Sequence, residues 1–452
     1  MKKFDKDKYL RKLKIKRWIQ NYSRYLYISV SCLFVCMIGI YFAYSKFFVK
    51  QEIEVVITTV GEFTNGDIVL NIYVDNEKVE EAPKNDDWYY VDSVSFNNNA
   101  EAVWDSDNWS LLVTKLTGKT KCDIYFKKIE SKVPDIIAQL DTTGKCPTIN
   151  ADGTVKVTAG ESTDGYLCKA KDTYGDSYYY RGTVTNNYVK FAGFYWRIVR
   201  INGDRSVRVI YDGTIAHANG TSRSDGYIGT SDFNDALTHS NSHVGYMYGS
   251  TKVTTYAGAH ANTNDSTIKK KVDDWYKTNI LGTAYEQYLT DNIFCNDRSI
   301  SRGVPSDGGY NNLGYAKNVT AYRWHYFATS SYNSKMMLTC PQQNDAFTVS
   351  DTTNGNGALT YPIAVLSVYE VILAGGWNVT NQKYYLCSGQ GWWTASLNVF
   401  SGTYANVLYV NSIGNASTGN SVGLTQGIRP VINLKPEALK NGDGTMDNPY
   451  EP

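Results

Sequence analysis

The chain of 452 residues lacks the short motifs that mark several classes of catalytic and metal site. It contains no phosphate-binding P-loop, and no two of its eight cysteines form a C-x-x-C pair. His239 and His243 stand four residues apart, but the glutamate of the H-E-x-x-H zinc motif is missing, and the Asn and Ser between them favour a loop. We therefore expect no metal site, name no catalytic residues, and expect a protein that is not an enzyme.

The chain also lacks an excess of positive charge outside its first 24 residues. These hold ten Lys or Arg against two acidic residues, a net charge of +8. Because the whole chain carries +1, residues 25–452 sum to −7. An acidic domain of this kind is a poor ligand for phosphate backbones, so nucleic acid is not an expected partner.

Residues 25–45 form a stretch without a charge directly after the basic arm 1–24. A run of about 20 apolar residues spans a bilayer, and Lys/Arg-rich flanks stay cytoplasmic. The pattern predicts a transmembrane signal-anchor helix and a cell membrane location, single-pass, with the C-terminal domain extracellular. A buried core helix is a weaker reading. Ala43 and Ser45 keep open a cleaved signal peptide that ends before Lys46.

The cysteines divide by location. Cys32 and Cys36 lie in the apolar segment, and the other six lie outside it, where disulfides persist if this part is extracellular. Sequence proximity favours the pair Cys146 and Cys168 and the pair Cys295 and Cys340. Cys122 and Cys387 are then left as a cross-domain pair or as two free thiols.

Two units are predicted after the apolar segment. Residues 51–130 show short alternating strands separated by turn residues, which predicts a β-sandwich stalk domain. Residues 131–140 form a linker, residues 141–440 the main domain and residues 441–452 a C-terminal tail.

Local patterns in 141–440 predict both strands and helices. Two apolar runs joined at Asn202-Gly203 predict a hairpin. After Asp265 or Ser266 as N-cap the spacing becomes helical, and this segment contributes Ile268, Val272, Trp275 and Tyr276 to one face.

Four segments carry a family resemblance: "FYWRIVRINGDRSVRVIYDG", "STIKKKVDDWYKTNILGTAYEQYL", "VLSVYEVILAGG", and "GWWTASL" with the later "GIRPVINL". In this order they resemble a bacterial extracellular family, the domain of unknown function 6273, over about residues 178–434. The resemblance implies a C-type-lectin-like fold of the formylglycine-generating-enzyme type, hence an α+β class. Thr394 departs from the family's W-L-R-S pattern, and Lys269–Lys271 make the helix start unusually basic.

The resemblance also assigns roles to single residues. Trp196, Trp275 and Trp393 are implied to be fold-defining aromatics, with Arg429 bracing the closing strand and Pro430 fixing its entry. The oxidase branch of the similar superfamily uses a close cysteine pair near this closing motif. Only Cys387 stands there, so that redox chemistry is not expected.

Calcium is the one cofactor that stays open. Asp443 and Asp447 in "NGDGTMDNP", and "DSDN" at 105–108, could supply oxygen ligands. Both stretches are also ordinary turn sequences, so we expect no cofactor.

The segment 398–417 suggests a recognition surface because Asn and Tyr recur there largely at alternate positions. Recognition loops favour these residues, and the whole chain holds 37 Tyr against 15 Phe. The solvent-exposed face of an ordinary β-sheet has a similar composition. The predicted ligand-binding residues are Asn398, Tyr404, Asn406, Tyr409, Asn411 and Asn415.

We therefore expect a bacterial surface protein that binds an extracellular glycan or protein ligand. Two alternatives are a structural cell-envelope scaffold and a variable receptor diversified by a retroelement. The oligomeric state does not follow from the sequence.

Overall fold

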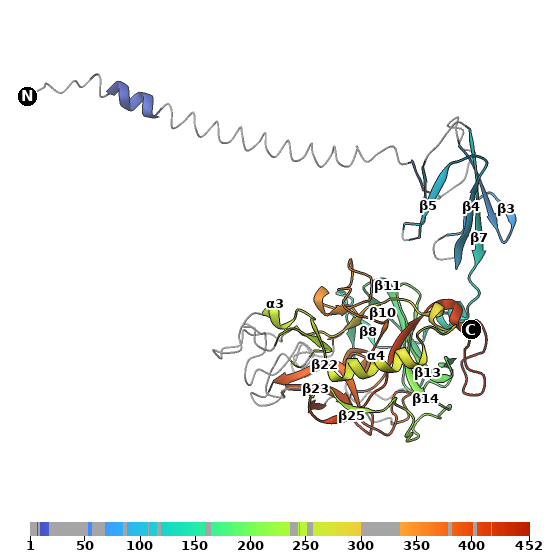
Figure 1. Cartoon of the computed structure of the whole chain (residues 1–452), viewed down its shortest axis with the longest axis vertical. Helices are drawn as coiled ribbons and strands as arrows, with labels where there is room; N and C mark the ends of the chain where they lie inside the picture. The colour runs from blue at the N-terminus through green and yellow to red at the C-terminus, as the bar shows by residue number, and fades with distance from the viewer. Residues whose placement is uncertain are drawn as a thin grey trace, which may run out of the picture. The chain divides into compact units, whose positions relative to one another are not determined.

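The computed structural model divides the chain into two compact units, residues 1–129 and 130–452 (Figure 1). The residues that it describes are 7, 10–17, 53–56, 68–84, 88–106, 108–114, 119–158, 164–235, 243, 245–250, 256–299, 335–377, 382–400, 405–416 and 418–452.

The first unit contains two β-sheets. One has the order β1-β6-β5, and the other has the order β3-β2-β7-β4 with a parallel β2–β7 pair. Residues on β7 alternate between buried and less buried positions, so that Cys122, Ile124 and Phe126 enter the core. The strands are β1 (Ile53–Val56), β2 (Ile68–Val74), β3 (Glu77–Val79), β4 (Tyr89–Phe96), β5 (Glu101–Asp105), β6 (Ser110–Thr114) and β7 (Thr120–Lys128).

The second unit is built on a sheet with the order β10-β11-β13-β14-β26-β21, and β12 pairs with β13. All seven residues of β14 are buried, as expected for a central strand covered on both faces. These strands are β10 (Tyr166–Asp172), β11 (Gly175–Arg181), β12 (Tyr188–Phe191), β13 (Phe194–Ile201), β14 (Val207–Gly213), β21 (Ile363–Ala364) and β26 (Val431–Leu434).

The β13–β14 hairpin differs in detail from the predicted turn. The connection runs over residues 202–206, and Arg205, with φ 71°, adopts the left-handed conformation. Gly203 is needed for space, because a Cβ there would lie 2.5 Å from the Asp172 carboxylate. The Asn-Gly pair thus marks the turn, but its glycine serves close packing rather than a positive φ.

A second sheet, with the order β15-β25-β22-β23-β24, carries the double tryptophan. Trp392 and Trp393 are fully buried on β22, and Trp393 Nε1 donates a 2.9 Å hydrogen bond to the Ser231 oxygen. The strands are β15 (Thr230–Asp232), β22 (Trp392–Phe400), β23 (Ala405–Val410), β24 (Thr418–Ser421) and β25 (Thr425–Gly427).

Few helices accompany these sheets. Ser266 caps α4 (Figure 1) by accepting from Lys269 N. The helix packs against β15 and β21. The helices are α2 (Val133–Ile137), α3 (Tyr256–Ala259), α4 (Thr267–Asn279) and α6 (Val368–Leu373), with 3-10 turns η2 (Glu286–Tyr288), η4 (Gln343–Asp345) and η5 (Pro436–Leu439). Short pairs complete the unit: β16 (Met247–Tyr248) with β17 (Asn264–Asp265), β18 (Phe294–Cys295) with β20 (Ala346–Phe347), and β9 (Val155–Lys156) between β8 (Thr148–Ile149) and β19 (Lys335–Met336).

The predicted α+β class is wrong, because the described residues form mostly β-sheet with few helices. The "VLSVYEVILAGG" segment yields the six-residue helix α6 only. The longest helix among the elements named above is α4, with 13 residues. Helical spacing was identified correctly at α4, but one such helix does not make a helical layer.

The predicted membrane anchor is also corrected. No helix among the described residues is long and apolar enough to cross a membrane. This finding contradicts the transmembrane signal-anchor helix and the single-pass membrane location with an extracellular C-terminal domain. The segment on which they rested, residues 25–45, lies outside the described part of the chain. A charge-free run satisfies only one requirement of a spanning helix.

Two disulfides cross-link the second unit. Cys146 is bonded to Cys168 and Cys295 to Cys340, the pairs that sequence proximity favours. Cys122 and Cys387 are free and buried, one in each unit. Burial raises the pKa of the Cys122 thiol to about 12.

Both ends of the second unit pack on its sheets. Lys132 N donates to the Leu439 oxygen, so the segment expected to be a linker joins the fold. In the expected tail, Tyr450 is buried and exchanges backbone hydrogen bonds with β12 through Tyr188 and Lys190.

Candidate functional site

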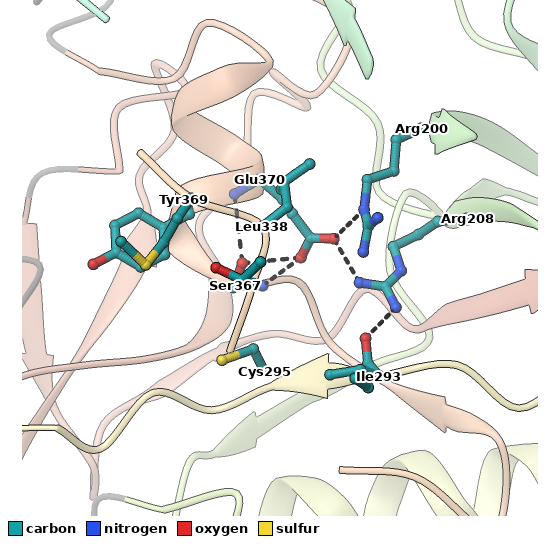
Figure 2. A pocket seen from close by; sticks show the side chains of 10 residues that line it. Arg200, Arg208, Ile293, Cys295, Leu338, Ser367, Tyr369 and Glu370 are labelled. Atoms are coloured by element: carbon teal, nitrogen blue, oxygen red, sulfur yellow. Dashed lines mark hydrogen bonds and ion pairs between the residues drawn. The ribbon is translucent and has the colours of Figure 1, made fainter. Parts of the chain in front are cut away.

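A buried ion-pair network lies between the main sheet and α6. The Glu370 carboxylate accepts from Arg200 Nε at 3.2 Å and from Arg208 Nη1 at 2.6 Å (Figure 2). It also closes the capping box of α6 with Ser367. Arg200 Nη1 lies 2.6 Å from Asp172, so two cations face two anions and the network is electrically balanced.

Electrostatics keep this network ionised. Burial by itself raises the pKa of Glu370, but the positive charges of Arg208 and Arg200 overcome that effect and lower it to about 2. Burial lowers the pKa of Arg208, which Glu370 opposes. Each partner therefore holds the other in its charged form.

The cavity beside this network is too small for a ligand. Its volume is about 10 Å³, and Ile293, Cys295 and Leu338 help to line it (Figure 2). A single water needs ~10–15 Å³ of such space. The network therefore connects the sheet to α6 and leaves no space for a ligand.

A second cavity, of about 230 Å³, opens beside the start of β10. We call it the β10 cavity. The residues that line it come from positions 139–141, from the start of β10, from β11 and from the turn after β11. The lining includes Gln139, Asp141, Tyr166, Tyr180, Thr185 and Asn186.

Two backbone pairings shape the β10 cavity. Asp141 N donates to the Leu167 oxygen, and Asp164 bridges to Thr183 on the other side. Gly165 permits the second contact, because a Cβ there would lie 2.6 Å from the Thr183 oxygen and 2.8 Å from Val184 Cα. The cavity therefore lies between these two pairings, beside the start of β10.

Asp141 is fully occupied by its own loop. Its Oδ1 accepts from the Thr143 amide and hydroxyl, and its Oδ2 accepts from the Lys145 and Cys146 amides. The Thr143 hydroxyl contributes most to lowering the pKa of Asp141, which lies at about 2. Four hydrogen bonds use the lone pairs of a carboxylate, so Asp141 anchors the loop before the Cys146 disulfide and offers little to a ligand.

Tyr180 also lines this cavity, and its hydroxyl is buried. It is 2% exposed, and its hydroxyl makes no hydrogen bond to any described residue. Burial, followed by Tyr450 nearby, raises its pKa, so the hydroxyl stays protonated and can donate. The Tyr450 hydroxyl bonds to Gln139, whose Oε1 accepts from Asn186 Nδ2 at 2.7 Å. Tyr450 therefore lies near the Tyr180 hydroxyl without satisfying it.

The remaining lining offers neutral hydrogen-bonding groups and one aromatic ring. Thr185 is exposed, and Asn186 and Tyr166 are half-buried. Amides and hydroxyls both donate and accept, while the Tyr166 ring gives an apolar surface. This combination suits a neutral, hydroxylated ligand.

The predicted recognition residues lie elsewhere. Tyr404 is outside the described residues, and the other five are half-buried: Asn398, Asn406, Tyr409, Asn411 and Asn415. None of these five lines the β10 cavity. They lie on β22, on β23 and in the turn after β23.

Contacts within the fold engage three of these residues. Asn411 Oδ1 accepts from the Ile413 and Asn415 amides and closes the turn after β23. The Tyr409 ring packs edge-on against Trp393 at 6.2 Å between centroids. A Cβ on Gly419 would collide with the Asn398 amide. These three are packed in the fold rather than spread along one open face.

The residues implied to define the fold lie in the core. Trp196 and Trp393 are fully buried, and Trp275 is half-buried with its ring 6.0 Å from that of Trp196. Arg429 donates to the Tyr211 and Leu386 oxygens and to Asp212. The Pro430 oxygen accepts from Tyr211 N, so both residues hold the closing strand to β14.

A G-x-S-x-G pattern occurs at 419–423, where Ser421 ends β24. A nucleophile elbow needs a strand, a sharp turn and then a helix. Here the chain turns from β24 directly into β25. The pattern is therefore part of a β-turn connection and not an elbow.

The stretches considered for metal have other uses. Among the described residues no group of three or more His, Cys, Asp or Glu could hold a metal ion. Asp443 accepts from the Thr445 amide and hydroxyl, and Asp105 accepts from Asn108, as turn residues do. His239 lies outside the described residues, and His243 is buried with its ring against Tyr248.

Sequence reasoning missed the β10 cavity because its walls come from segments with ordinary patterns. Gln139 and Asp141 stood at the boundary between a predicted linker and the main domain. The "SYYYRGTVTNN" stretch at 177–187 concentrates Tyr, Thr and Asn, and this composition was the available signal.

No protein-family model, curated protein or solved structure matches this chain. The resemblance to the 6273 family therefore rests on the quoted motifs alone.

Proposed function

We propose that the second unit binds the end of a neutral glycan in the β10 cavity. The observation that carries this proposal is the neutral polar lining of the cavity, where Gln139, Thr185 and Asn186 lie with the Tyr166 ring. Amides and hydroxyls of this kind can donate hydrogen bonds to sugar hydroxyls and accept from them.

The charge of the lining supports a neutral ligand. The only acid among the lining residues is Asp141, and its four hydrogen bonds leave it no free lone pair for an amine or a cation. No Lys, Arg or His is among the lining residues to pair with an anion. Gln139, Thr185 and Asn186 can serve the hydroxyls of a sugar.

The size of the cavity supports a terminal sugar rather than a long chain. A volume of about 230 Å³ is below the ~300–1,000 Å³ typical of sites for drug-sized molecules. One sugar ring, with its apolar face toward Tyr166 and its hydroxyls toward Thr185 and Asn186, is a ligand of fitting scale.

The test is binding of the full chain to arrays of neutral oligosaccharides, acidic oligosaccharides and peptides. We expect neutral oligosaccharides to bind, and we expect Thr185→Ala and Asn186→Ala each to weaken binding about tenfold, since one good hydrogen bond is worth about 1 kcal/mol or more. The control is Tyr178→Phe, on β11 but not in the cavity lining.

Three outcomes contradict the proposal. Binding of peptides alone favours a protein receptor, and the absence of any binding favours a scaffold. Neutral glycan binding that both cavity variants leave intact would place the site elsewhere, with the 398–415 residues as the next candidates.

A further inference from the structure

Three buried guanidinium groups surround Asp212 at the end of β14. Its Oδ1 lies 2.7 Å from Arg429 Nη2 and 2.8 Å from Arg223 Nη2, and its Oδ2 lies 3.9 Å from Arg197 Nη1. The side chains of all four residues have 0% exposure. Because arginine stays protonated in proteins, this cluster carries two positive charges more than its own carboxylate offsets.

The excess is a property of this cluster and not of the fold in general. The network around Glu370 pairs Arg200 and Arg208 with two carboxylates and is balanced. Asp225 lies near this cluster, but its carboxylate is bonded to Thr214 and lies 2.6 Å from His217 Nε2. Burial raises the pKa of Tyr385 and of the Cys387 thiol, so neither supplies a negative charge.

The mutual repulsion of the three cations acts on Arg429. The pKa of Arg429 is lowered to about 10, mainly by burial and also by the positive charges of Arg223 and Arg197, while Asp212 opposes them. A buried charge is normally paired or compensated. One carboxylate cannot compensate three guanidinium groups.

Arg223 is the member with unused donors. Arg197 donates to Asn187, Asn219 and the Val184 oxygen, and Arg429 donates to two backbone oxygens besides Asp212. By contrast, Nε and Nη1 of Arg223 make no hydrogen bond to any described residue. Buried donors in native proteins nearly always face an acceptor, whether protein, water or ion.

We propose that Arg223 holds a small monovalent anion, of the halide class, inside the second unit. A water molecule could accept from Nε or from Nη1 but would leave the two excess charges uncompensated. A chloride ion bound at either nitrogen removes half of the excess. The site is separate from the β10 cavity, whose lining does not include Arg223.

Chloride itself is the probe for this site. The full chain is unfolded by heat in sodium chloride and sodium gluconate mixtures at constant ionic strength. A ligand that binds only the folded state lowers the apparent unfolding constant about tenfold for each tenfold rise in its concentration above Kd. We expect this dependence on chloride in the wild type and its loss in Arg223→Met. Arg200→Met, from the balanced network, should keep the wild-type dependence on chloride.

Crystals of the wild type soaked in bromide give an independent readout if the variants do not fold. We expect anomalous density next to Nε or Nη1 of Arg223. Equal stability in chloride and gluconate, together with water density alone at Arg223, overturns the proposal. Chloride dependence that persists in Arg223→Met overturns it as well. Neither result bears on glycan binding.

Discussion

Arg197 Nη2 donates a hydrogen bond of 2.8 Å to the backbone oxygen of Val184. Val184 lines the β10 cavity, while Arg197 belongs to the cluster around Asp212. Asn219 Nδ2 donates to the same oxygen at 2.7 Å, and its Oδ1 accepts from Arg197 Nη1 at 2.9 Å. One wall of the proposed binding site is therefore fixed by the charged core behind it.

Replacement of Asn219 tests this support. Asn219→Ala removes one bond to the Val184 oxygen and leaves Arg197 Nη1 without that acceptor. Hydrogen bonds to charged groups are worth about 1.5–3 kcal/mol, so we expect a loss of about 2 kcal/mol in the free energy of unfolding by urea. Thr221→Ala, an exposed neighbour in the same loop, should change it by less than about 0.5 kcal/mol. Equal effects of the two substitutions would contradict the assigned role.

The Glu370 network predicts a dependence of stability on pH. The folded-state pKa of Glu370, about 2, is below its ordinary value of 4.5. Its contribution is therefore fully present above about pH 4.5 and is lost as the pH falls toward 2. We expect the difference in unfolding free energy between wild type and Glu370→Gln to shrink by roughly 3 kcal/mol from pH 7 to pH 2. Parallel pH profiles for the two proteins would show that Glu370 is not held ionised by Arg200 and Arg208.

Gly165 tests the geometry of the β10 cavity. A Cβ at this position would lie within 3 Å of the backbone at Thr183 and Val184, so Gly165→Ala should push the two segments apart. We expect a loss of about 1–3 kcal/mol, as for overpacking, together with weaker glycan binding. Gly144→Ala provides a contrast, because no atom lies near its Cβ position and only its φ of 79° opposes the substitution. It should lower stability without affecting the binding of glycan by the folded protein.

The double tryptophan and the following turn are predicted to contribute unequally to stability. Trp393→Ala removes a fully buried ring and its hydrogen bond to Ser231, so we expect a loss of about 3–5 kcal/mol. Asn411→Ala removes two acceptor contacts that close a surface turn, for which about 1 kcal/mol is expected. Urea unfolding of both variants checks the order. A larger loss in Asn411→Ala would mean that the turn, and not the ring, holds this sheet.

Most of the patterns that the sequence revealed act within about 20 residues, and the Cys295–Cys340 pair, 45 residues apart, is an exception. The N-cap Ser266 and the apolar spacing after it identify α4, because capping and helical periodicity act between near neighbours. The β13–β14 hairpin follows from one turn signal between two apolar runs. The spacing of Cys146 and Cys168 likewise brings together residues that are close along the chain.

Contacts over long sequence separations could not be predicted in this way. Arg208 and Glu370 are 162 residues apart, and nothing local to either residue indicates its partner. Arginines at 197, 200 and 208 read as the polar positions of strands, yet all three are buried. The β10 cavity depends on the meeting of 139–141 with 164–167 and 183–186, a property of the folded backbone and not of any one segment.

The pairing of β14 with β26 bears on how the protein is made. Val207–Ile210 pair with residues 431–434, so one edge of the central strand stays open until more than 200 further residues have left the ribosome. An apolar strand with an open edge is a template for wrong pairing. Folding that depends on such distant contacts is slow. We therefore expect the growing chain to need a holding chaperone during its synthesis, and any stop codon before residue 431 to yield aggregated product.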